Sequence, residues 1–238
     1  MIATTWQDIA AGFKAQLDAR LPKGLPTEFG QDVSGLVRES SLLTSVEKEI
    51  VRLDATDLRR CVREKQYTAV AVTAAYLKAA ALAHAATNCL MDYFPEEAMA
   101  RAHFLDDELE RTGKTVGPLH GLPVSVKGGW EGELLMTDHL GLAGHEITAG
   151  FASWVGKQIP DKDGTYVSIL RKAGAGERGV DWAKSVFYVK TTNPQAIMHL
   201  ETDSFLGPTL NPFNRKLTCG GSSGGEGALI GAGGSPLG

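Results

Sequence analysis

The spacing of apolar residues predicts helices over most of the first half of the chain. Apolar positions recur at helical intervals over 4–20 and again over the alanine-rich stretch 68–86. Shorter helices are expected over 45–52, with Ser45 as its cap, and from a Thr56 cap to Arg63. Pro95 suits the first turn of a further helix, which Gly113 ends. The first half of the chain is therefore predicted to be mostly helical.

Short apolar runs in the second half predict strands. The run 122–126 ends at a lysine, and 186–189 is continuously apolar, as buried parallel strands are. Residues 88–94 are also expected to be extended, residues 21–43 irregular, and Asp163 should cap a helix over 164–172. Helices that alternate with short strands predict an α/β fold.

Composition narrows the class of protein. The 238 residues are 43% hydrophobic and 22% charged, as in a globular protein, and the net charge of −4 provides no basic surface for nucleic acid. We find no apolar run of about 18 residues and no signal peptide, so we expect neither a membrane span nor secretion. Cys61, Cys89 and Cys219 fit neither a disulfide framework nor zinc spacing, which favours reduced thiols and a cytoplasmic location.

A glycine-walled serine pair, GGSSGG at 220–225, is the most unusual stretch. Such a serine marks either a tight turn or a place where substrate touches the backbone, and composition alone does not choose between these. The stretch also fits the hydrolase pattern Gly-x-Ser-x-Gly, but that pattern requires a later histidine, and all six histidines precede it. A phosphate-binding P-loop is excluded because Glu226 follows Gly225.

Lysine can activate a serine, and Lys127 is the candidate. It ends the apolar run 122–126, where partial desolvation would disfavour its charged form and lower its pKa toward that of a base. The alternative is an ordinary lysine that ends a strand and extends into solvent.

The chain resembles the amidase signature family, and most closely its fungal acetamidase-like branch. The matching stretches are GPLHGLPVSVK at 117–127, AGA at 173–175, VFYVKTTNPQ at 186–195 and GPTLNPFNRKLTCGGSSGGEGALIGAGGSPLG at 207–238. The resemblance implies a mixed sheet wrapped by helices. The chain would be the N-terminal part of one such domain over 1–238, with a helical extension over 1–43 and the α/β body over 44–238.

The resemblance also implies a serine–serine–lysine mechanism of amide hydrolysis without a metal or an organic cofactor. Lys127 matches the family's lysine, and Ser222 matches its bridging serine, which follows a non-prolyl cis peptide bond. The substrate would be a small amide bound near Ile197, Met198 and Ser223, although ordinary packing also explains the two apolar residues.

The family's acyl-forming serine lies further along, beyond Gly238. The alternative is therefore a non-catalytic remnant, whose open sheet edge should favour self-association. Two stretches, 128–137 and 176–185, interrupt the family pattern, and we interpret them as translated intron remnants or lineage-specific loops.

Overall fold

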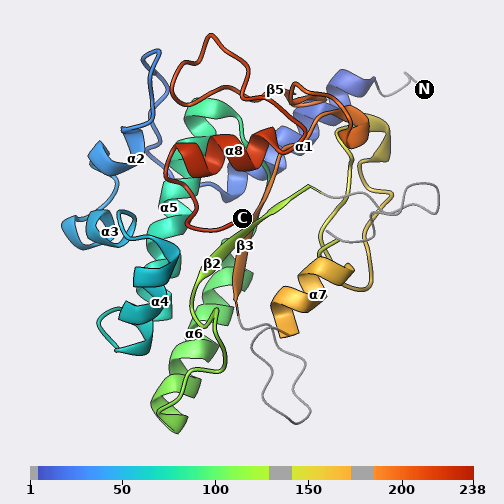
Figure 1. The fold of residues 1–238 in the computed structure, drawn as a ribbon. Coiled ribbons are helices and arrows are strands. Elements are labelled where there is room, and N and C mark those ends of the chain that lie inside the picture. The colour runs from blue at the N-terminus through green and yellow to red at the C-terminus, as the bar shows by residue number, and fades with distance from the viewer. Residues whose placement is uncertain (1–4, 129–140, 173–184) are drawn as a thin grey trace.

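A small mixed sheet lies at the centre of the molecule (Figure 1). The computed structural model describes residues 5–128, 141–172 and 185–238. Strands β1 (Leu90–Tyr93), β2 (Pro123–Lys127) and β3 (Val186–Thr191) pair in the order β1-β3-β2. β1 runs antiparallel to β3, and β2 runs parallel to it. The expected mixed sheet wrapped by helices is thus confirmed.

The helices of the described residues include those that the apolar spacing predicts in the first half of the chain. The described helices are α1 (Trp6–Arg20), α2 (Leu36–Glu39), α3 (Ser45–Ile50), α4 (Ala55–Arg63), α5 (Ala69–Thr87), α6 (Pro95–Thr112), α7 (Thr165–Lys172) and α8 (Gly224–Gly231), with short 3₁₀ turns η1 (Ala152–Trp154) and η2 (Gln195–Ile197). A separate hairpin joins β4 (Asp203–Ser204) to β5 (Gly207–Pro208).

Three details of the predicted helices need correction. Thr44, one residue before the predicted cap Ser45, caps α3, because its side chain forms a reciprocal capping box with Glu47. Asp54 rather than Thr56 caps α4 by accepting a hydrogen bond from the Asp57 amide. The stretch 21–43, expected to be irregular, contains the single turn α2.

Helix α5 is the core helix, and most of its side chains are buried. It packs against α6, α8 and β3. At the start of α5, the Ala69 and Val70 amides donate hydrogen bonds to Asp106 of α6. Of the described helices, α5 alone is long and apolar enough to cross a membrane by length and composition, which corrects the expectation that no such run exists. Since 72% of its most apolar window is buried inside the structure, we interpret it as a core helix.

The two faces of the sheet bury different clusters. Val186 and Tyr188 of β3 join the large cluster around α5 and α8, whereas Phe187 joins Val124 and Val126 of β2 in a smaller cluster with α7. Since strand side chains alternate between faces, Ser125 and Lys127 lie on the face opposite Val124 and Val126. This alternation directs Ser125 and Lys127 toward α8.

The outer edge of β2 carries the last residues of the chain. The Ser125 amide donates to the Leu237 carbonyl at 3.0 Å, and the Ser125 hydroxyl contacts the Ser235 hydroxyl at 3.0 Å. Self-association through a sheet edge stays a prediction, as does the division of the domain at residues 43 and 44. The two interrupting stretches, 128–137 and 176–185, lie outside the described residues except for Gly128 and Ser185.

Candidate active site

The sheet and α8 bring the Lys127 amine and the Ser222 hydroxyl together. Lys127 is the last residue of β2, opposite Thr191 in the parallel register, and its Nζ donates to Ser222 Oγ at 2.7 Å. Both side chains are half-buried. Residues 95 positions apart in the sequence thus meet at hydrogen-bond distance, as a lysine-activated serine requires.

The serine lies in a loop whose backbone is tightly confined. The Gly221–Ser222 peptide bond is cis, as the family resemblance implies. A Cβ on Gly221 would lie 2.5 Å from the His199 carbonyl oxygen, so residue 221 must lack a side chain for the loop to take this path. Ser223 is exposed and directly precedes α8.

Glu226 is a third polar residue beneath the pair, and the sequence did not single it out. Its two carboxylate oxygens accept from the Ser125 hydroxyl at 2.7 Å and from the Thr191 hydroxyl at 2.9 Å. Only 8% of Glu226 is exposed. An acidic residue within the otherwise small and apolar run 224–231, together with a serine inside the apolar strand 123–127, was the signal available in the sequence.

Burial controls the charges of these groups. It lowers the pKa of Lys127 below its ordinary value of 10.5, and the negative charge of Glu226 opposes this change. Burial raises the pKa of Glu226 above 4.5, while the hydrogen bonds from Ser125 and Thr191 and the charge of Lys127 act in the opposite direction. The neutral amine, which can accept a proton from a serine, is therefore more accessible at Lys127 than at a solvated lysine.

The other predicted residues lie in a loop beside the serines. Ile197 ends the turn η2 and is half-buried, whereas Met198 is 71% exposed. The backbone of the next residues, 199–201, packs against Gly221, so this loop and the serine loop are neighbours. No hydrogen bond between Ser223 and this loop is found among the described residues.

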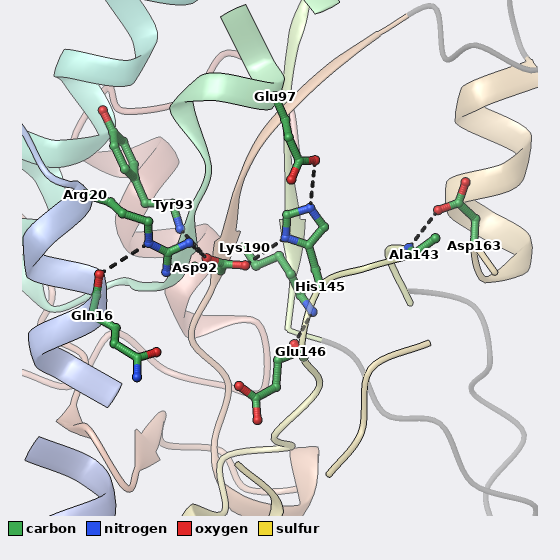
Figure 2. Close-up of polar contacts among 10 residues, drawn as sticks. All are labelled: Gln16, Arg20, Asp92, Tyr93, Glu97, Ala143, His145, Glu146, Asp163 and Lys190. Atoms are coloured by element: carbon green, nitrogen blue, oxygen red, sulfur yellow. Dashed lines mark hydrogen bonds and ion pairs between the residues drawn. The ribbon is translucent and has the colours of Figure 1, made fainter. Parts of the chain in front are cut away.

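A second polar cluster involves Lys190 of β3. Lys190 precedes Thr191, so its side chain lies on the sheet face opposite the Lys127–Ser222 pair. Figure 2 shows His145 between the carboxylates of Asp92 and Glu97, with Nδ1 at 2.8 Å and Nε2 at 3.1 Å from their oxygens. Arg20 of α1 pairs with Asp92 at 2.7 Å, and Lys190 Nζ donates to the Glu146 carbonyl.

Burial by itself would raise the pKa of Asp92, but its bond to His145 and the charges of Arg20, His145 and Lys190 hold that pKa below its ordinary value. The cluster therefore contains an ionised carboxylate that joins α1 and β1 to the segment after Leu142, and we interpret it as structural.

Comparison with known proteins finds relatives of this sequence and this fold. A family model described as Amidase matches residues 71–238. A putative amidase of Schizosaccharomyces pombe is 44% identical, and the match covers 98% of this chain and 41% of the relative. An acetamidase of Aspergillus oryzae is 40% identical, and that match covers 100% of this chain and 41% of the relative. The solved structure of a fatty acid amide hydrolase is 34% identical and aligns with a TM-score of 0.79 over 97% of this chain and 39% of its own. The chain thus spans about two fifths of the length of the relatives that it matches.

Proposed function

The chain belongs to the amidase family, and we propose that its protein hydrolyses the carbon–nitrogen bond of small carboxylic amides to an acid and ammonia. The observation that carries this proposal is the 2.7 Å hydrogen bond between Lys127 Nζ and Ser222 Oγ at the end of a buried strand. The names of the acetamidases among its relatives support small amides as the substrate class.

In the proposed mechanism, Lys127 is the base and Ser222 the relay. The neutral amine takes the proton of the Ser222 hydroxyl, which in turn takes the proton of the attacking serine. The attacking oxygen forms a bond to the amide carbon, and the departing nitrogen receives the proton back through the relay. Water then releases the acid from the acyl serine. The relay supplies the base, so the proposed mechanism uses no metal ion and no organic cofactor.

The attacking serine belongs, in this proposal, to the segment that follows residue 238 in the family. The exposed Met198, the neighbouring Ile197 and Ser223 would border the acyl group, because the 195–201 loop adjoins the serine loop. Free thiols at all three cysteines support a cytoplasmic location as part of the same proposal.

A second candidate is a non-catalytic form of the same fold, in which the Lys127–Ser222 relay has no attacking serine to activate. The transcript downstream of the Gly238 codon decides between the two candidates. An in-frame Gly-Thr-Asp-x-Gly-Gly-Ser would supply the attacking group, whereas an immediate stop codon would leave the relay without a group to activate.

Ammonia release from acetamide tests the mechanism. In a protein that includes the downstream segment, Lys127→Met and Ser222→Ala should each reduce turnover by about 100-fold or more, because a positioned acid–base group contributes that much. Lys216→Met, at an exposed lysine, is the control and should leave turnover unchanged. Full activity in folded Lys127→Met would rule out the proposed role of the lysine.

A further inference from the structure

A cavity of about 480 Å³ lies between α6, α7 and the start of β3, and none of its lining residues belongs to the Lys127–Ser222 pair. Its size lies within the range of small-molecule sites. The side chains that line it include Phe94, Leu142 and Phe187, which also pack together in the smaller core cluster. The cavity therefore offers an apolar surface to a ligand.

Two arginines extend into this apolar setting from different helices. Arg101 of α6 lies over the Phe104 ring, with its guanidinium carbon 4.8 Å from the ring centroid. All three of its guanidinium nitrogens are shielded from solvent and have no hydrogen-bond partner among the described residues. Arg171 of α7 lies over the Phe187 ring at 5.3 Å and forms an ion pair with Asp163.

Two donors of the cavity, the Arg101 guanidinium and the Ser185 hydroxyl, have no acceptor among the described residues. Ser185 is fully buried, lines the cavity, and its hydroxyl has no partner in the described part of the chain. Glu97 also lines the cavity, but it is bound to His145 (Figure 2). The Glu97 side chain is 69% exposed. Unmade hydrogen bonds of a buried charged group are costly, so an acceptor at this position would be strongly favoured.

The charges in the cavity favour an anion. Burial lowers the pKa of Arg101 to about 10, and the positive charge of Arg171 acts in the same direction. The Arg101 guanidinium therefore remains charged at neutral pH. Asp163 already balances Arg171, which leaves one positive charge at Arg101 without a counter-ion among the described residues.

We propose that this cavity binds a carboxylate carried on an apolar body. The carboxylate would accept hydrogen bonds from Arg101 and Ser185, and its hydrocarbon would lie against Phe94, Leu142 and Phe187. Arginine pairs with carboxylates through two parallel hydrogen bonds, and one negative charge matches the single unbalanced cation. The apolar walls favour such a molecule over inorganic phosphate.

Calorimetric titration of the 238-residue chain with octanoate tests this site. We expect saturable binding of octanoate, with 1-octanol binding at least about tenfold more weakly because it lacks the charge-assisted hydrogen bonds. Arg101→Met should reduce octanoate affinity by about tenfold or more. Arg111→Met is the matched control, since Arg111 lies on the same helix with a 68% exposed side chain paired to Glu108.

Three further measurements separate a lost site from a lost fold and from the proposed active site. The thermal midpoint of ligand-free Arg101→Met should equal or exceed that of the unchanged chain, because an unpartnered buried charge is removed. Ser185→Ala should weaken octanoate binding without unfolding, and Lys127→Met should leave it unchanged, which also separates this site from the proposed active site. Equal binding of octanoate and octanol, full affinity in Arg101→Met, or loss of binding in Lys127→Met would each overturn the proposal.

Discussion

Helix α8 approaches the end of β3 so closely that residue 225 has no room for a methyl group. The Gly225 amide donates to the Thr192 carbonyl at 3.2 Å, and a Cβ on Gly225 would lie 2.4 Å from both the backbone nitrogen and the carbonyl oxygen of Thr192. Gly227, two residues later in the same helix, has nothing within 4 Å of the corresponding position. Gly225→Ala and Gly227→Ala therefore form a matched pair.

The size of the effect follows from these distances. Real Cβ atoms essentially never come within 3.0 Å of such neighbours, so α8 in Gly225→Ala must move by about 0.6 Å or more against backbone atoms. Overpacking of this kind costs about 1–3 kcal/mol of unfolding free energy. Gly227→Ala should instead stabilise the chain by about 1 kcal/mol, because alanine favours the helix and restricts the unfolded chain.

Thermal unfolding followed by circular dichroism measures both changes. Each 1 kcal/mol shifts the midpoint of a chain of this size by about 2–4 °C, so Gly225→Ala should melt several degrees below the unchanged chain and Gly227→Ala about 2–4 °C above it. The shift in α8 should also separate Ser222 from Lys127, which faster acetylation of Lys127 would report. A Gly225→Ala protein that melts at or above the unchanged chain would refute this account of how α8 is positioned.

Three further predictions concern the same site and the core. Acetylation of Lys127 by acetic anhydride should have a pH midpoint below 10.5, and Glu226→Gln should lower that midpoint further, because the Glu226 charge raises the pKa of the lysine. The pKa of Glu226 in the folded chain lies above 4.5. As the pH rises from 4.5 through that folded pKa, the unfolding free energy of the unchanged chain should therefore fall relative to that of Glu226→Gln. If urea unfolding shows a difference between the two proteins that does not change with pH, the raised pKa is contradicted. Leu82→Ala, at a fully buried position of α5, should cost about 2–5 kcal/mol in urea unfolding, whereas Leu217→Ala, at a 56% exposed position, should cost much less.

The parts of the fold that the sequence predicted are those with strong local signals. The alanine-rich run 68–86 places α5 within one residue of its observed start and end, and Pro95 and Gly113 bound α6 as expected. The apolar runs likewise locate β2 and β3. In each case the periodicity and the terminal residues agree with the final packing.

The parts that the sequence did not predict depend on distant contacts. Helix α8 contains four glycines among eight residues, a poor helical composition, and it is stabilised by packing of buried Ala228 and Leu229 against the α5 cluster. Glu226 acquires its surroundings from Ser125, 101 residues earlier. The Lys127–Ser222 pairing was predicted from the family resemblance. Lys127 and Ser222 are 95 positions apart, and no local sequence pattern indicates contacts over that separation.

The parallel pairing of β2 with β3 has a consequence for how this lineage can vary. Both interrupting stretches fall within one crossover, between the end of β2 at Lys127 and the start of β3 at Val186. Lengthening a connection between two fixed ends by about half its length costs only about 0.4 kcal/mol in closure entropy. Evolution can therefore add or remove residues in this crossover while the two strand ends, and the amine and hydroxyl anchored near them, keep their mutual position.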